Sequence, residues 1–188
     1  MIRLSLTILI GILANGVMAL DEPDYAVIES IGDQMEVREY PAFTVASVSV
    51  DADMKSAGNQ GFRLLADYIF GNNQSDEKIA MTAPVFQTRI AEEGQKVSFF
   101  LTHSMEEAPS PVNDRVEIES SAMTVAVIRY KGGWSMDKYH KHLNALAGQL
   151  EATGKWRIAG EPIWARYDPP FKPAWWRTNE VMLPVSLN

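Results

Sequence analysis

The chain carries the same order of elements twice. A strand, a helix and two further strands fill its first half, and the same order returns in its second half. When Ala46 is placed against Ala126 the offset is 80 residues, and a similar offset brings Phe99 close to Val181. Each half has one amphipathic helix and an antiparallel sheet whose inner face needs cover. The repeat therefore predicts an α+β fold made of two related halves.

The first half combines alternating strands with one helix. The helix presents Phe62, Leu65 and Ile69 on a single face, and either Ser56 or Asp53 is its expected N-cap. The predicted strands of this half span residues 35–40, 43–50, 79–88 and 97–103.

The second half has the longer helix. It is predicted to begin after an N-cap at Ser135 and to stop at Thr153 and Gly154. Its apolar stripe consists of Tyr139, Leu143, Leu146 and Leu150. The predicted strands of this half span residues 115–119, 123–130, 156–167 and 180–185.

Residues 1–19 have the pattern of a secretory signal peptide. Arg3 precedes an apolar run, and the small residues Val17 and Ala19 fit signal peptidase, which predicts cleavage after Ala19. An uncleaved anchor is the alternative, but the apolar run is shorter than the roughly 20 residues that span a bilayer. We expect residues 20–188 to form a single domain in the periplasm or outside the cell, with no stable membrane anchor.

The net charge and the lack of cysteine exclude some classes of function. Without residues 1–19 the chain keeps 16 basic and 24 acidic residues, a net charge of −8, which argues against nucleic acid as a partner. The chain has no Cys, so it has neither a disulfide framework nor a thiolate that acts as ligand or nucleophile. Its stability is expected to come from a packed core.

Two segments are similar to the two signature stretches of the SOUL haem-binding family. Residues 78–85 read KIAMTAPV, and residues 167–185 read YDPPFKPAWWRTNEVMLPV. The pair Trp175 and Trp176 is a departure, because family members usually carry fewer aromatic residues there. The resemblance extends over about residues 25–185, and with the signal peptide the chain resembles a bacterial exported member.

The resemblance implies a distorted antiparallel β-barrel, made of pseudo-duplicated strand-helix-strand-strand halves and flanked by two helices. It also implies reversible binding of haem or a related tetrapyrrole in an apolar groove, by a carrier, buffer or sensor that is not an enzyme. The architecture is similar as well to the effector domains of bacterial drug-sensing regulators, which bind flat apolar compounds. Fold alone therefore indicates a class of ligand.

The resemblance also implies which residues contact haem. Phe62, Leu65 and Ile69 match the apolar wall of the groove, and Arg63 and Lys172 match basic positions that would contact the propionates. Met81 is an additional pocket residue, because its soft side chain suits the face of a porphyrin. Ordinary core packing is the other interpretation of these apolar residues.

No histidine stands out as an axial ligand. His140 and His142 are two positions apart on a helix, so they point to different sides and do not chelate one metal. His103 is a weak candidate at the end of a strand. We therefore predict no metal site, and exchangeable haem binding that depends on apolar contact.

Two rival functions remain open. One is a hydrolase or binder of other flat apolar molecules, with Glu161 or Glu180 near Trp164 and Trp176 as the first catalytic candidates. The chain lacks the usual Ser-hydrolase, zinc-protease and phosphate-loop motifs, which disfavours this alternative. The other rival is an interaction or stress protein that binds haem only adventitiously.

Overall fold

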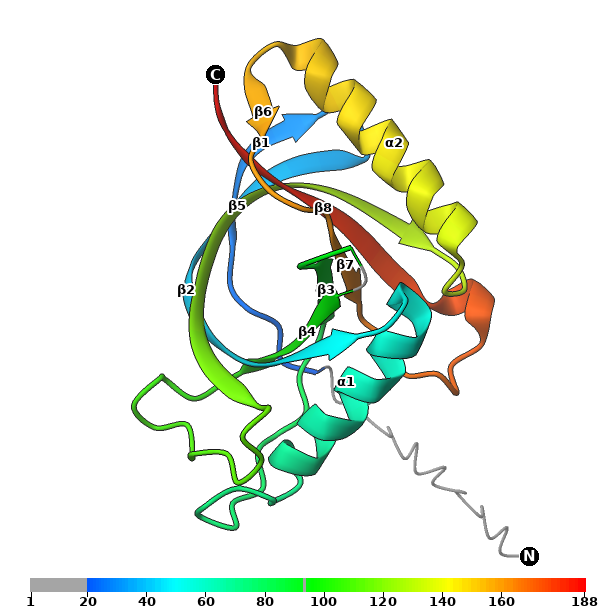
Figure 1. Ribbon diagram of the computed structural model, residues 1–188. Coiled ribbons are helices and arrows are strands. Elements are labelled where there is room, and N and C mark those ends of the chain that lie inside the picture. The colour runs from blue at the N-terminus through cyan, green and yellow to red at the C-terminus, as the bar shows by residue number, and fades with distance from the viewer. Residues whose placement is uncertain (1–19, 93) are drawn as a thin grey trace, which may run out of the picture.

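Six antiparallel strands close into a barrel, and two helices pack on its outside (Figure 1). The computed structural model describes residues 20–92 and 94–188, so the predicted signal peptide lies outside the described residues. The strands are β1 Ala26–Ile31, β2 Met35–Asp51, β3 Val85–Arg89, β4 Gly94–Leu101, β5 Glu117–Lys131, β6 Trp156–Ile158, β7 Ile163–Arg166 and β8 Thr178–Leu187. The helices are α1 Met54–Ile69, α2 Met136–Thr153 and the short 3-10 helix η1 Ala174–Trp176.

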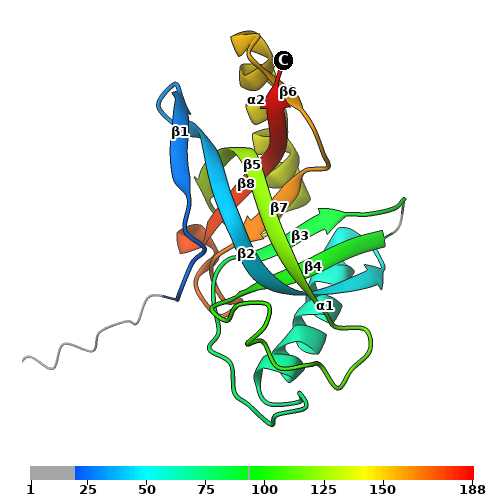
Figure 2. The same ribbon diagram turned by 90° about the vertical axis from the view of Figure 1, so that its left-hand side faces the viewer.

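The barrel confirms the duplicated α+β fold. Its strand order is β2-β4-β3-β7-β8-β5, and β5 returns to pair with β2. The first half supplies β2, α1, β3 and β4, and the second supplies β5, α2, β7 and β8. In the long β2–β5 ladder Ala46 pairs with Ile118, and Ala126, its counterpart in the second half, pairs with Val37. Counterpart residues of the two halves therefore make counterpart pairings. β1 extends the sheet at β2 and β6 pairs with β8 (Figure 2).

Both faces of the barrel wall are buried. α1 covers β2 and β4, and α2 covers β5, β6 and β8. The inner face holds a smaller cluster made of Tyr40, Phe86, Val125, Val127, Ala165 and Met182. Because side chains alternate along each strand, one residue faces a helix and the next faces the barrel interior.

The helix caps agree with the sequence pattern. Asp53 is the N-cap of α1, and its side chain accepts from the backbone N–H groups of Lys55 and Ser56. α2 has Ser135 at its N-cap position and ends at Gly154, whose φ of 62° is the left-handed conformation that glycine adopts at low cost.

The predicted strands at 79–88 and 156–167 are wrong in part. Residues 79–84 lie outside the ladders of the barrel, and only Thr82 forms an isolated bridge, to Asp21. Pro84 has no N–H to donate, so β3 begins after it. The second segment divides into β6 and β7 on either side of Gly160, which lies against the Pro184 ring.

Neighbouring pairs of predicted strands merge elsewhere. The strands predicted at 35–40 and 43–50 form one strand, β2, which bends at an irregularity between Tyr40 and Phe43. The strands predicted at 115–119 and 123–130 likewise form the single strand β5. Long bent strands are suited to a closed barrel, because they pair with different neighbours along their length.

Two helix glycines give a test of the packing of α1 on the sheet. A Cβ at Gly61 would lie 2.6 Å from Cβ of Val97 on β4, whereas a Cβ at Gly148 on α2 meets nothing within 4 Å. We expect Gly61→Ala to destabilise the fold by about 1–3 kcal/mol through overpacking. Gly148→Ala is the matched control and should stabilise it by about 0.5–1 kcal/mol. Chemical denaturation measures both, and equal effects would contradict the close approach.

Candidate functional site

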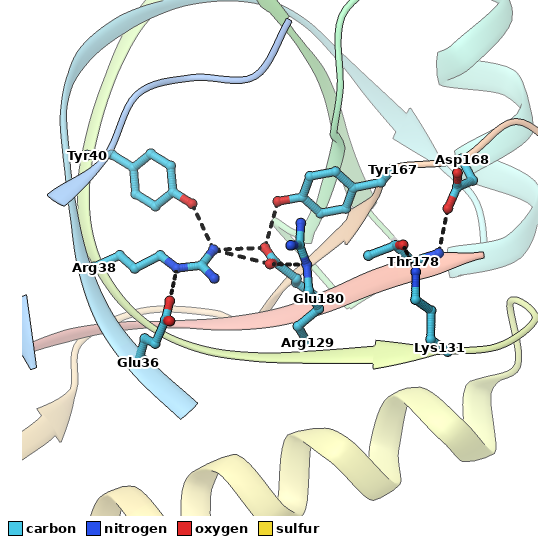
Figure 3. A network of polar contacts seen from close by, with 9 residues as sticks. All are labelled: Glu36, Arg38, Tyr40, Arg129, Lys131, Tyr167, Asp168, Thr178 and Glu180. Carbon is cyan, nitrogen blue, oxygen red and sulfur yellow. Dashed lines mark hydrogen bonds and ion pairs between the residues drawn. The ribbon is translucent and has the colours of Figure 1, made fainter. Parts of the chain in front are cut away.

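A buried carboxylate lies at the centre of a polar network inside the barrel (Figure 3). Glu180 on β8 is 0% exposed and accepts from Arg38 on β2, whose Nη1 lies 3.2 Å from each carboxylate oxygen. Arg129 on β5 contributes Nε at 2.9 Å, and the Tyr167 hydroxyl donates at 2.7 Å. Three strands and the segment after β7 therefore meet at one carboxylate.

The charges of this network shift the pKa values of its members. Burial alone would lower the pKa of Arg38, but the Glu180 carboxylate holds it above its ordinary value. Burial and the same carboxylate raise the pKa of Tyr167, whose hydroxyl donates to it. Burial also raises the pKa of Tyr40 to about 12. The network thus keeps its tyrosines neutral and its arginines charged.

Glu180 is poorly placed to act in hydrolysis. Two guanidinium groups and a hydroxyl occupy its oxygens, so it serves as an ion-pair partner. It lies beside Ala165 across the β7–β8 ladder and faces the interior, whereas Trp164 faces the opposite side and packs under α2. Trp176 lies in the loop before β8. Glu180 therefore shares no site with either tryptophan, contrary to the arrangement expected from the sequence.

One hollow lies between the N-terminal ends of the helices. Its volume is about 710 Å³, and its lining includes Met54 of α1, Tyr139 and Leu143 of α2, and Gln95 of β4. Glu161, the other catalytic candidate, is an exposed residue at its rim. The lining mixes apolar and charged side chains, and its volume is in the range of small-molecule pockets.

A second hollow of about 640 Å³ lies at the end of the barrel near β1. Tyr25, Arg38 and Arg129 contribute to its lining, so it reaches the outer side of the Glu180 network. The Arg38 guanidinium lies 4.3 Å from the Tyr25 ring centroid, a cation–π contact that covers the ion pair. None of the six haem contacts predicted from the sequence lines either hollow.

The helix residues of the predicted groove wall separate into two groups. Leu65 and Ile69 are fully buried in the core beneath α1, so they present no surface to a ligand in this structure. Phe62 is partly buried with its ring edge-on to Phe99 at 5.2 Å. Met81 packs partly buried against the same core. The apolar stripe of α1 covers the outward-facing apolar side chains of β2 and β4. Leu65 and Ile69 are therefore buried against the sheet.

The two predicted propionate contacts differ in setting. Arg63 is exposed on α1. Lys172 is partly buried and pairs with Asp168, whose other oxygen accepts from the backbone N–H of Thr178. Burial opposes ionisation of Asp168, but the Lys172 ammonium and this N–H lower its pKa. Ligand contacts by these two residues and by Phe62 and Met81 stay predictions.

The loop before β8 exposes three large aromatic side chains. Phe171, Trp175 and Trp176 are 87%, 70% and 63% exposed, and the two indole rings lie edge to face with centroids 6.4 Å apart. Asp168 and Arg177 hold the loop, since Arg177 Nε donates to the carbonyl of Lys172. Exposed aromatic residues grouped in this way are typical of a binding surface.

The histidines offer no built metal centre. His103 Nε2 lies 3.1 Å from Glu77, and His142 is stacked on Tyr130 with centroids 4.0 Å apart. In the part of the chain that the structure describes, no group of three His, Asp or Glu side chains is arranged to hold a metal ion. His103 stays a weak candidate for an axial ligand, and the absence of a metal site stays a prediction.

The sequence interpretation missed the buried arginines. In the alternating sequence of its strand, Arg38 falls on the face opposite to that of Met35 and Val37. In an open antiparallel sheet, a basic residue on that face is normally exposed to solvent. Closure of the barrel covers both faces of β2 and β7, so Arg38 is buried on the inner face and Arg166 is partly buried on the outer face. A base flanked by aromatic residues, as in the segment from Trp164 to Tyr167, is the signal that points to such sites.

The sequence model of the SOUL heme-binding protein family matches residues 20–184. Heme-binding protein 2 of Homo sapiens is 34% identical over 181 residues, which cover 88% of this chain and 86% of that protein. Among the described residues, no helix has the length and apolarity needed to cross a membrane.

Solved structures share the fold at low identity. EcmrR in its DNA complex superposes with a TM-score of 0.64 at 15% identity, over 81% of this chain and 57% of EcmrR. A hydrolase from Listeria innocua superposes with a TM-score of 0.60 at 11% identity, over 84% of this chain and 94% of that one. At such identities the likeness shows the fold alone.

The ion network predicts a large effect of neutralising Glu180. Glu180→Gln removes the only buried counter-charge of Arg38 among the described residues and leaves it the partly exposed Glu36, so we expect a loss of about 3–5 kcal/mol in the free energy of unfolding. Glu36→Gln is the control, because Glu36 pairs with the same arginine from a side chain that is 39% exposed, and should cost about 0–1 kcal/mol. Urea denaturation measures both, and equal small losses would show that the network is not needed for stability.

Tyrosine burial predicts alkaline instability. Burial raises the pKa of Tyr40, Tyr68, Tyr130 and Tyr139 to about 12, and that of Tyr167 also rises. The unfolded chain releases tyrosine protons from about pH 10. It therefore binds fewer protons than the folded protein between about pH 10 and 12, and stability falls as the pH rises through that window.

Tyrosinate absorbance measures this directly. We expect the five tyrosines with raised pKa values to stay protonated at pH 10 in the folded protein and to titrate from about pH 10 in denaturant. Six ordinary titrations in the folded protein would contradict the burial of these hydroxyls.

Proposed function

This chain belongs to the SOUL heme-binding protein family, and we propose that it binds haem or a related tetrapyrrole reversibly. The observation that carries the proposal is the match to this family over residues 20–184, together with 34% identity to Heme-binding protein 2 over most of both chains. The family is one of binding proteins. Binding in the service of transport, buffering or sensing is the role we propose, in place of catalysis.

The loop before β8 supplies the most suitable surface for a flat macrocycle. Trp175 and Trp176 expose their rings, and stacking on such rings removes a large apolar area of a porphyrin from water. Lys172 lies in the same loop, and an ammonium beside an aromatic patch suits a propionate. Because Lys172 already pairs with Asp168, its contribution is expected to be moderate.

The helix residues complete the proposal. Phe62 and Met81 keep some exposure, and Arg63 offers a charge on the surface of α1. These three stay proposed haem contacts from the family resemblance. With His103 paired to Glu77, we propose that binding rests on apolar and propionate contacts and that the haem exchanges readily.

We also propose that residues 1–19 direct export and that binding takes place in the periplasm or outside the cell. Localisation of a tagged full-length chain, and the N-terminal sequence of the purified protein, test export and cleavage after Ala19.

A haem titration tests the proposed function. Ferric haem added to residues 20–188 should shift the Soret band with saturation at one haem per chain. A double Trp175→Ala and Trp176→Ala variant should bind about tenfold more weakly, because two stacking surfaces are lost. Phe70→Ala removes another exposed aromatic residue, from the end of α1, and should bind like the wild type.

Charge variants complete the test. Lys172→Glu and Arg63→Glu should each weaken binding several-fold, whereas Arg157→Glu on β6 makes the same charge change away from the proposed surface and should not. Uptake that is linear in haem and equal in all variants would show that the binding is nonspecific, and a screen of other flat apolar compounds would follow.

A further inference from the structure

A second, partly buried arginine lies on the outer face of the barrel, between the two helices. Arg166 on β7 donates from Nη2 to Gln87 Oε1 at 2.9 Å, and Gln87 is held in turn because its amide donates to the Met54 carbonyl at 2.6 Å. Gly58 of α1 lies so close that a Cβ there would be 2.8 Å from both terminal nitrogens of Arg166. The guanidinium is thus fixed against the sheet, the helix and one amide.

Aromatic rings enclose the rest of the guanidinium. Its central carbon lies 5.3 Å from the Trp134 ring centroid and 5.5 Å from that of Trp164. Trp134 also receives Arg177, at 4.6 Å. The ladders β5–β8 and β8–β7 place Tyr130, Asn179 and Arg166 in one row on the same face of the sheet.

Unpaired hydrogen-bond donors gather around this row, and the row itself holds one unpaired acceptor, Asn179 Oδ1. Arg166 Nε, Trp134 Nε1, Trp164 Nε1 and the Tyr130 hydroxyl are buried, and each has no hydrogen-bond partner among residues 20–92 and 94–188. Buried polar groups are normally paired, so an excess of unpaired donors over one unpaired acceptor in one place indicates missing acceptor atoms. Such a set of donors matches a carboxylate, which accepts several hydrogen bonds at two oxygens.

Arg166 brings a positive charge to the site, and the acids nearby, Asp53, Glu92 and Glu161, line the adjoining hollow without pairing with it. None of the ion pairs formed within the described part of the chain includes Arg166. Burial without a counter-charge lowers the pKa of Arg166 to about 10. Glu180 is adjacent in sequence to Asn179, the strand partner of Arg166, but it faces the barrel interior, where it pairs with Arg38 and Arg129.

We propose that the cluster of Arg166, Trp134 and Trp164 binds the carboxylate of an organic anion that enters between α1 and α2. Arg166 and Trp134 both keep some exposure, which provides the approach. The 710 Å³ hollow adjoins the cluster, because its lining residue Tyr139 packs 5.1 Å from Trp164 and its lining residue Gln95 contacts Gln87. The apolar part of the anion lies in this hollow, against Met54 and Leu143.

The carboxylate has two possible sources, a free organic acid and a propionate of haem. Benzoate is the probe for the first, with benzamide as its uncharged isostere. Ferric haem and mesoporphyrin dimethyl ester are the probes for the second, because the ester has no carboxylate. Tryptophan fluorescence and calorimetry at constant ionic strength report binding.

Wild type, Arg166→Gln, Trp134→Phe and the control Arg157→Gln are compared. We expect one carboxylate source to bind the wild type at least tenfold more tightly than its uncharged counterpart. Arg166→Gln should remove that preference, Trp134→Phe should reduce it several-fold by removing one N–H, and Arg157→Gln should leave it unchanged. Arg166→Gln should also be no less stable than the wild type, because it removes an unpaired buried cation.

The outcomes separate this inference from haem binding. Preference for benzoate with no saturable haem binding supports the carboxylate site and rejects haem as ligand. Haem binding that ignores both esterification and Arg166→Gln, with benzoate equal to benzamide, overturns the carboxylate site and leaves the proposed function intact. If Arg166→Gln fails to fold, Trp134→Phe decides, and an unchanged carboxylate preference in it overturns the proposal.

Discussion

Closure of the barrel is the constraint on which the other features depend. The two halves join through the β2–β5 and β3–β7 ladders, and each ladder gives the edge of one half a partner in the other. An open three-stranded half would expose a strand edge and one apolar face. Closure of the barrel pairs the exposed strand edges, and it packs the apolar inner face of each half against that of the other. The helices then cover the outer face.

Charged residues are covered on both faces of the barrel wall. Those on the inner face have ion-pair partners, whereas Arg166 on the outer face has none among the described residues. Inside, Glu180 lies between Arg38 and Arg129, so the charges compensate one another and hold four parts of the chain together. Outside, Arg166 has aromatic rings and an amide as neighbours. A one-residue step along β8 separates these environments, since adjacent side chains point to opposite sides. The acid therefore cannot reach the arginine that lacks one.

The inner and outer faces of the barrel wall therefore have different roles. The interior network is fully paired and serves stability, whereas the outer face between the helices combines an uncompensated cation, unpaired donors and a hollow of suitable size. The aromatic loop before β8 connects to that face through Arg177, which contacts the ring of Trp134. A family that binds haem and a groove that favours carboxylates are chemically compatible, because haem carries an apolar face and two propionates.

The sequence by itself determined the duplicated halves, the two helices with most of their caps, the fold class and the family. These follow from local periodicity, capping residues and two contiguous motifs, all of which act over a few residues. Only the tertiary structure decided which side chains are buried and which are exposed. Leu65 and Ile69, expected in a ligand wall, lie in the core beneath α1, and Arg38, whose burial no local pattern indicates, is 5% exposed. Burial is decided by which strands pair across the two halves, and partners such as Glu180 and Arg38, 142 residues apart, leave no local pattern.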